Sequence, residues 1–513
     1  MRMTHPATWL FSVMLIGATE AAPQAQTAPR PPRPLAARIV FTQIPVHAPA
    51  QHAPTAASRI VTLDTTRPRN AITVLTPGFV TARYPDVSFD GRRILFVGTR
   101  RQAPANAAPA TDPADPSGTR HVWEINIDGT GLRRITPLSG PRVADAPAIY
   151  LSTMYTMDAD RPIAQIAFIS EEHGRAIHTC HMDGTHVRQI TFNPYGVSDP
   201  WLLSDGRLLY SQRRPRAAGA GDAQASCLMT INTDGTDIFP FAAVHEPPAD
   251  RGMPCETADG LVVYVESTSG DRYGGGSLVA VARTRSLHTR RVIAPDRDGL
   301  YCTPSPTVDG SLLVSYIAQA GASYGIHVLD VATGKRAGNV YDDPAWHDIG
   351  AVVAAPRPTP NGRSSVVDDR ALTGWLYCLD ASMSDRANAR HVPPGSIRRV
   401  RVIRAARLAS HEETLGHATV ESDGSFFIEV PARTPLRLET LDDSGAVLQR
   451  MSNWIWVMPH ERRGCIGCHE DRELTPPNRH VLALRRPAER IGTHHRGSFG
   501  AAGHNAPRGA PVK

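Results

Sequence analysis

The architecture is clearest in one segment, His121-Val122-Trp123-Glu124-Ile125-Asn126-Ile127-Asp128-Gly129-Thr130. Its β-branched and aromatic residues predict a strand, and the Asp-Gly pair predicts a tight turn, because hairpin turns favour residues that tolerate positive φ. The triplet Asp-Gly-Thr recurs at Asp128, Asp183 and Asp234, at intervals of 55 and 51 residues. A repeat of this length made of strands and turns is typical of β-propeller blades.

Each repeat is expected to contain four short strands. A second kind of Asp-Gly turn precedes a strand at Asp90, Asp205, Asp259 and Asp309, so the repeat extends on both sides of the triplets. The incomplete unit at residues 38–75 and the strands expected at 351–355 and 374–380 would close the ring. We therefore predict an all-β protein with a propeller at residues 38–385, of six blades or alternatively seven.

A different module follows the repeats. Short strands are expected at residues 396–404, 418–420, 425–430, 436–441 and 447–451, separated by Asp-Gly and Asp-Asp-Ser-Gly turns. This pattern predicts a small β-sandwich-like module at residues 390–490. The Gly- and Ala-rich residues 491–513 are expected to be a disordered tail.

One motif in this module carries chemistry, Cys465-Ile466-Gly467-Cys468-His469. It matches the C-x-x-C-H attachment motif of c-type haem. Cys465 and Cys468 would form thioethers to the two porphyrin vinyl groups, and His469 would be the proximal iron ligand. A zinc half-site and a redox disulfide or pair of free thiols are the alternatives. The nearby Trp454 and Trp456 would either wall the haem or fill the sandwich core.

The N-terminus predicts export. Residues 1–22 resemble a signal peptide with a short apolar core at 9–18, and residues 23–37 form a Pro-rich linker. An uncleaved single anchor is the alternative, but the apolar core is too short to span a bilayer, and we expect no stable membrane span. A periplasmic or secreted location follows, which is where covalent haem attachment takes place.

Composition excludes several functions. The net charge of +6 comes from scattered arginines without a basic block interleaved with aromatic residues, so nucleic-acid binding is not expected. The sequence contains no G-x-S-x-G, H-E-x-x-H or Walker motif. His173, His178, His181 and His186 lie close together in sequence and would be either metal ligands or exposed loop residues.

Two segments carry a family resemblance, VESDGSFFIEVPARTPLRLETLDDSG at 420–445 and WVMPHERRGCIGCHEDRELTPPNR at 456–479. Together with an exported propeller, they resemble the hydrazine synthase alpha subunit family, over most of residues 38–486. The resemblance implies a propeller followed by a domain with one covalent haem c on Cys465, Cys468 and His469. That family carries a further haem in an N-terminal domain, for which this chain has neither a second motif nor room, so hydrazine synthesis itself is not expected.

The sixth iron ligand would decide between two functions. His480 is the candidate that we name, because the Pro476-Pro477 turn could fold it over the porphyrin. The other candidates are Met451, Met458, His411, His417, His460, His494, His495 and His504.

A six-coordinate iron would make the chain an electron-transfer or redox-accessory protein, with the propeller as docking platform for a redox partner protein. An open iron would make it a haem enzyme or sensor for a small nitrogen species or peroxide. A propeller scaffold without haem is a third hypothesis. The oligomeric state is not indicated. The remaining cysteines, expected to be buried thiols or blade-to-blade bridges, are Cys180, Cys227, Cys255, Cys302 and Cys378.

Overall fold

The computed structural model describes residues 35–46, 57–67, 72–101, 118–155, 163–172, 174–214, 225–243, 246–268, 270–318, 323–383, 392–405, 412–467 and 480–492. These residues belong to one compact unit, Pro34–Lys513. They form strands and three short 3-10 turns, η1 (Arg283–Arg285), η2 (Asp296–Asp298) and η3 (Leu482–Arg485). Within these ranges no helix is long and apolar enough to cross a membrane. The predicted signal peptide, most of the predicted linker and all but the first two residues of the predicted tail lie outside the described residues; of those two, Ile491 is buried and its N–H donates to the Glu429 carbonyl oxygen at 2.9 Å.

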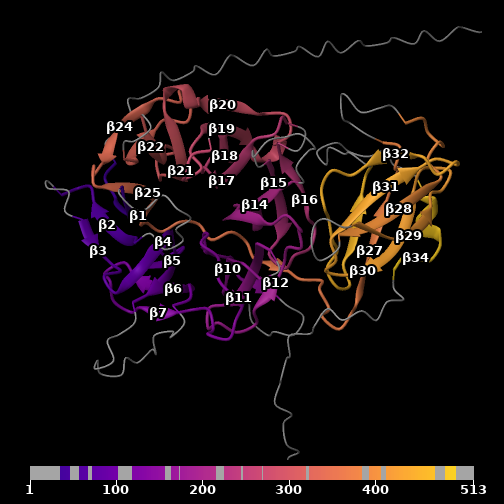
Figure 1. Ribbon diagram of the computed structural model, residues 1–513, viewed down its shortest axis with the longest axis horizontal. Helices are drawn as coiled ribbons and strands as arrows, with labels where there is room; N and C mark the ends of the chain where they lie inside the picture. The colour runs from indigo at the N-terminus through magenta and orange to yellow at the C-terminus, as the bar shows by residue number, and fades with distance from the viewer. Residues whose placement is uncertain are drawn as a thin grey trace, which may run out of the picture. The chain divides into compact units, whose positions relative to one another are not determined.

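Six four-stranded antiparallel sheets make up the repeat region (Figure 1). The first contains β25 (Trp346–Val353), β1 (Arg38–Pro45), β2 (Arg59–Asp64) and β3 (Ile72–Val74). The second and third contain β4 (Phe79–Val87), β5 (Arg93–Arg100), β6 (His121–Asn126) and β7 (Arg133–Arg134), then β8 (Ile149–Tyr150), β10 (Gln165–Ser170), β11 (Ala176–His181) and β12 (Arg188–Gln189). The fourth contains β13 (Val197–Leu202), β14 (Arg207–Arg213), β15 (Ser226–Asn232) and β16 (Phe239–Ala242). The fifth and sixth contain β17 (Asp250–Glu256), β18 (Leu261–Ser267), β19 (Ser277–Ala282) and β20 (Arg291–Ala294), then β21 (Leu300–Pro306), β22 (Leu312–Ile317), β23 (Gly325–Leu329) and β24 (Arg336–Tyr341).

The sheets follow one another in a closed ring. The inner strand of each sheet contacts the inner strand of the next, in the order β25, β4, β8, β13, β17, β21 and back to β25. The ring is closed by β25, which comes after the sixth sheet and pairs antiparallel with the N-terminal β1. Gln43 on β1 donates a 2.8 Å hydrogen bond from Nε2 to the buried carboxylate of Asp348 on β25. This arrangement is a β-propeller, as the sequence predicts.

The Asp-Gly-Thr triplets form the outer hairpin turns of three blades, also as predicted. Each central glycine has a φ between 82° and 90°. In all three turns the aspartate Oδ1 accepts hydrogen bonds from the backbone N–H and the hydroxyl of the threonine, at 2.9–3.0 Å and 2.7 Å. For Asp128 and Asp183 these hydrogen bonds, that of the threonine hydroxyl foremost, lower the pKa of the carboxyl.

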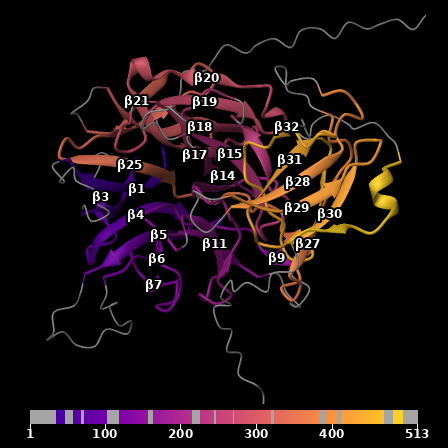
Figure 2. The same ribbon diagram turned by 45° about the vertical axis from the view of Figure 1, so that its right-hand side comes forward.

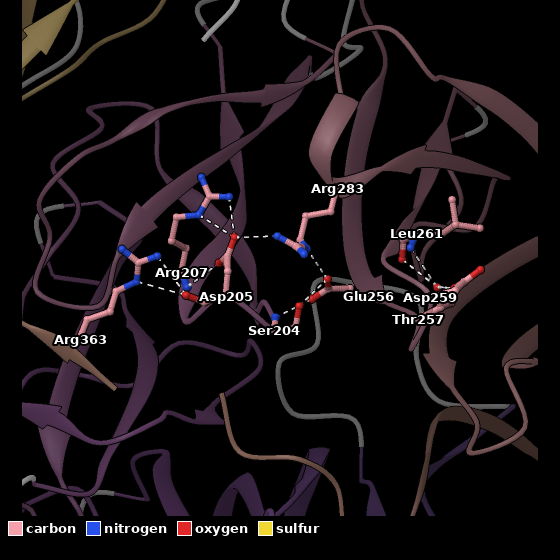
Figure 3. Close-up of polar contacts among 9 residues, drawn as sticks. All are labelled: Ser204, Asp205, Arg207, Glu256, Thr257, Asp259, Leu261, Arg283 and Arg363. Carbon is pink, nitrogen blue, oxygen red and sulfur yellow. Dashed lines mark hydrogen bonds and ion pairs between the residues drawn. The ribbon is translucent and has the colours of Figure 1, made fainter. Parts of the chain in front are cut away.

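The second kind of Asp-Gly turn, at Asp205, ties the fourth blade to the fifth (Figure 3). The Asp205 carboxylate, between β13 and β14, accepts from Arg207 at 2.7 Å and pairs with Arg283 of the next blade at 3.2 Å. The Glu256 carboxylate at the end of β17 accepts the Ser204 N–H at 2.6 Å and pairs with the same Arg283 at 2.8 Å. Every carboxylate of this cluster therefore has a partner within the chain, which assigns the cluster to blade packing.

After the ring the chain passes back along the third and fourth blades. β26 (Arg363–Ser364) pairs in parallel with β9 (Met154–Tyr155). Arg363 donates to the Asp205 carbonyl oxygen through Nη2 at 3.0 Å, and Ser365 donates to the Asp234 Oδ2 at 2.8 Å. These hydrogen bonds hold the segment that connects the propeller to the C-terminal module against the fourth blade.

The C-terminal module consists of two four-stranded sheets, drawn in orange and yellow in Figure 2. One contains β33 (Arg462–Cys465), β27 (Thr373–Cys378), β30 (Phe426–Pro431) and β34 (Glu489–Arg490). The other contains β29 (Glu412–Thr419), β28 (Arg399–Ala405), β31 (Leu436–Leu441) and β32 (Val447–Arg450). Buried residues of both sheets, among them Leu376, Ile428, Val400 and Leu438, belong to one core cluster. Sheet packs on sheet, as a β-sandwich requires.

One strand lies elsewhere than expected. Residues 374–380 were predicted to help close the propeller, whereas β27 pairs with β30 and β33 of the sandwich. The strand has the alternating burial of a sheet with one covered face, and such a pattern fits either neighbour. Periodicity along a single strand cannot identify its partners.

Candidate functional site

The motif begins where the edge strand β33 ends. Cys465 is the last residue of β33 and its side chain is half-buried, whereas the other cysteines in the described ranges are fully buried. Cys468 and His469 lie outside the described residues. The backbone of the motif is fixed by β27, because the Leu379 N–H donates to the Cys465 carbonyl oxygen at 2.9 Å and the Asp380 N–H to the Ile466 oxygen at 3.2 Å.

Two glycines let the motif lie close against its neighbours. A Cβ atom on Gly464 would lie 2.5 Å from the ring of Tyr377, and one on Gly467 would lie 2.4 Å from the Met383 carbonyl oxygen. Real Cβ atoms do not approach other atoms so closely, so these positions require glycine. On the exposed side the Arg462 guanidinium lies over the rings of Tyr377, at 5.7 Å, and Phe427, at 4.9 Å.

Beyond the motif, the described residues begin again at His480, and the chain joins the same sheet at β34. The side chain of His480 is exposed, and η3 follows two residues later. The Leu482 N–H donates to the Asp423 carboxylate at 2.9 Å, and the Ala483 N–H donates to the Ser425 hydroxyl at 3.0 Å. Burial opposes ionisation of Asp423, but the hydrogen bonds from Leu482 and Ser425 outweigh it and lower the pKa of this carboxyl. The turn before β30 thus anchors the first residues of η3.

The remaining sequence-named ligand candidates divide by exposure. Met458 is fully buried against Gly235, and a Cβ atom on Gly235 would lie 3.0 Å from the Met458 sulfur. Met458 is therefore a packing residue. His417 and His460 are exposed, and the His460 ring packs edge-on against Trp375 at 5.5 Å. Met451 is partly buried beside the sandwich core. The candidates His411, His494, His495 and His504 lie outside the described residues.

The two indoles are core residues. Trp454 is 1% exposed and Trp456 0%, and Trp456 belongs to a cluster that also contains Tyr210 and Met229 of the fourth blade. The Trp456 Nε1 donates to the Gly235 carbonyl oxygen at 3.3 Å. The third Asp-Gly-Thr turn is therefore buried under the sandwich, although its sequence is the same as that of the two exposed turns.

Sequence reasoning missed Glu461, four residues before Cys465. Its side chain is 4% exposed, and its two carboxylate oxygens accept the Asp237 N–H at 2.8 Å and the Met458 N–H at 2.6 Å. Glu461 thus joins the third Asp-Gly-Thr turn to the segment that leads into the motif. Burial raises the pKa of this carboxyl to about 7, against the opposing effect of the nearby Arg463. A single Glu between Pro-His and Arg-Arg carries no sequence signal of burial.

Glu461 gives the protein a specific pH dependence. Its pKa of about 7 in the folded chain exceeds the ordinary 4.5, so between these values the folded chain binds more protons than the unfolded chain. The unfolding free energy is therefore expected to fall as pH rises from 4.5 to 7, by about 3 kcal/mol from this group. In Glu461→Gln this part of the slope disappears, as measured by urea unfolding at several pH values. Asp348, whose pKa burial also raises to about 7, supplies a background slope in both proteins.

The exposed Glu171 provides the matched control, because Glu171→Gln should leave the slope unchanged. If Glu461→Gln unfolds with the pH dependence of the unmodified chain, the carboxyl is not held in its protonated form by burial.

The other sequence-named clusters do not form sites. Cys180, Cys227, Cys255 and Cys302 are buried thiols on β11, β15, β17 and β21, and none of these four forms the blade-to-blade bridge that the sequence left as an alternative. Burial raises the pKa of Cys180 to about 12. His181 and His186 stack at 4.2 Å, His178 is buried, and His173 lies outside the described ranges. Among the residues that the structure describes, no three His, Cys, Asp or Glu side chains are placed to hold a metal ion.

Comparison with known proteins places these features in context. A family model described as the hydrazine synthase alpha subunit middle domain matches residues 378–470. Hydrazine synthase subunit alpha of Kuenenia stuttgartiensis is 25% identical over 551 residues, which cover 84% of this chain and 66% of the relative. The solved Kuenenia stuttgartiensis hydrazine synthase has a TM-score of 0.73 at 23% identity, covering 88% of this chain and 71% of that chain. TolB from Acinetobacter baumannii has a TM-score of 0.41 at 12% identity, and the match covers 63% of this chain and 68% of the TolB chain.

The fold and the motif define a propeller protein with a C-terminal sandwich module. The family model and the curated relative show that this chain is similar to the hydrazine synthase alpha subunit, and the solved structure shows that the two share a fold. The matched family segment is the sandwich, from the end of β27 to just past Cys468. The chain spans 66% of the length of the curated relative.

Proposed function

We propose that this chain is an exported monohaem c-type cytochrome-like protein with an electron-transfer or redox-accessory role. The observation that supports it best is the setting of Cys465, a half-buried thiol at the end of an edge strand, in a chain whose other described cysteines are buried. A half-buried thiol at a strand end is within reach of a porphyrin, whereas a thiol within a blade is not. The hydrazine synthase relationship adds support for a redox function.

Residues in and around the motif would have separate roles in holding the haem. Cys465 and Cys468 would hold one haem c as thioethers, and His469 would be its proximal ligand. When bound, the haem supplies an iron that accepts and releases one electron. β27 fixes the backbone of Cys465, and Asp423 fixes the start of η3. His480, whose side chain is exposed, would be the distal ligand.

The propeller would serve as the docking platform. The ring of blades is closed by the pairing of β1 with β25, and the carboxylates of Asp205 and Glu256 are paired with arginines of the same chain, so we assign these carboxylates a structural role. The first partner class is a redox protein that delivers or removes the electron. The word subunit in the name of the curated relative favours a partner that assembles with the chain stably.

A second function follows if the iron is open on its distal side. The protein would then bind or turn over a small nitrogen species or peroxide. Hydrazine synthesis is not proposed, because the sequence contains one C-x-x-C-H motif.

Visible spectra of the exported, haem-matured protein test the proposal. We expect a sharp low-spin α-band on reduction and no change on adding CO or NO. A high-spin spectrum that shifts with either gas would replace electron transfer by the enzyme or sensor function. His480→Ala should convert the low-spin spectrum to the high-spin, gas-sensitive form, whereas His417→Ala, also an exposed histidine of the module, should not.

A further inference from the structure

Two cysteines lie side by side on adjacent strands of the sheet that carries the motif. β27 and β33 run parallel, and their register pairs Cys378 with Cys465. Residues in register on adjacent strands project to the same face of a sheet. Both side chains also meet the same apolar cluster, of which Cys378 is a buried member and against which Cys465 packs. The two thiols are therefore neighbours on the core face of the sandwich.

The spacing of adjacent strands suits a covalent bond. Neighbouring strands lie roughly 4.7–4.9 Å apart, within the roughly 4.4–6.8 Å between Cα atoms that disulfides span. The backbone bonds from Leu379 and Asp380 hold this register on the C-terminal side of the pair. In the described sheets the other cysteines are in register with residues that carry no thiol: Cys180 with Ile166, Cys227 with Gln212, Cys255 with Val263 and Cys302 with Ser315.

The structure shows no disulfide between the two sulfurs. We propose that Cys378 and Cys465 are oxidised to a disulfide in the haem-free chain, so that Cys378 protects Cys465 until haem is attached. The regulatory meaning of this bond rests on the proposed function, since it concerns the thiol that would hold the haem. The disulfide itself is a property of the two strands.

The difference in exposure determines which of the two cysteines reacts first. Cys465 is half-buried and Cys378 is 1% exposed, so an oxidant reaches Cys465 first. The Cys465 thiolate attacks the disulfide of an oxidising protein in the exported compartment, which forms a mixed disulfide and releases one thiol. Cys378 then attacks the Cys465 sulfur and releases the second thiol. The chain loses two electrons and two protons, and the disulfide of the oxidant becomes two thiols.

Haem attachment requires the reverse step. A thioether forms from a free thiol, so a dithiol reductant must first reopen the bond, and that reductant becomes a disulfide in turn. Cys378→Ser removes the protecting partner. The variant is expected to take up haem in cells that lack a periplasmic dithiol reductant, where uptake by the unmodified chain falls severalfold. Cys302→Ser, which also changes a buried strand thiol, should behave as the unmodified chain.

Disulfide mapping decides the proposal directly. The full chain is exported without c-type haem assembly, its thiols are blocked with iodoacetamide at lysis, and a non-reducing digest is analysed by mass spectrometry. We expect the peptides of Cys378 and Cys465 to be linked in most molecules. Linkage of Cys465 to Cys468, or alkylation of Cys465 and Cys378, would overturn the inference.

The two proposals fail separately. A chain that attaches haem but shows no Cys378–Cys465 linkage retains the proposed function and loses this inference. A chain that shows the linkage but never attaches haem retains this inference and loses the proposed function.

Discussion

Replacing both Cys465 and Cys468 by alanine is expected to abolish the proposed covalent attachment of haem when the chain is exported and matured with c-type haem assembly. Each thioether needs its own sulfur, so the double variant retains no covalent bond to the porphyrin, and its haem signal after denaturing electrophoresis falls to background. The effect concerns attachment more than folding, because Cys465 lies at the end of an edge strand and is only half-buried.

The matched control is Cys302→Ala. Cys302 is fully buried on β21 of the propeller, and its replacement should cost some stability and leave the haem signal unchanged. Haem that stays bound through denaturation in the double alanine variant would refute attachment at this motif.

Replacing Trp456 by alanine is expected to give the largest loss of stability of any variant considered. The indole is fully buried between the fourth blade and the sandwich, packs edge-on against Phe192 at 5.8 Å and donates to the Gly235 carbonyl oxygen. Removing a buried indole costs about 3–5 kcal/mol, and here the Gly235 oxygen also loses its donor. Urea unfolding followed by circular dichroism measures the change.

Trp375→Ala is the control for Trp456→Ala. Trp375 lies on β27 of the same module and is half-buried, so its loss removes less contact and should cost clearly less. Equal costs for the two variants would mean that Trp456 does not join the propeller to the sandwich.

The propeller could be predicted because its signal is local and repeated. Asp90, Asp128, Asp205 and Asp259 each precede a glycine at a hairpin turn, and this chemistry is set by the neighbouring residues alone. The sequence pattern of β27 was equally local, yet it did not reveal that the strand pairs with β30 and β33. Pairing between strands far apart in sequence depends on packing that no short window contains.

The candidate site was predictable only in part, for the same reason. The motif at Cys465 is a contiguous signature, whereas Cys378 precedes it by 87 residues and becomes its neighbour only through the parallel pairing of two strands. Glu461 is buried because an Asp-Gly-Thr turn 224 residues earlier supplies the Asp237 N–H. The indoles at Trp454 and Trp456 were compatible with a haem wall or a core, and their burial assigns them to the core.

The intact mass of the denatured, exported and haem-matured chain tests the central claim most directly. The account predicts a single species whose mass is that of the processed polypeptide plus one haem. The mass of the polypeptide alone, under conditions in which another c-type cytochrome of the same cells is matured, would contradict it.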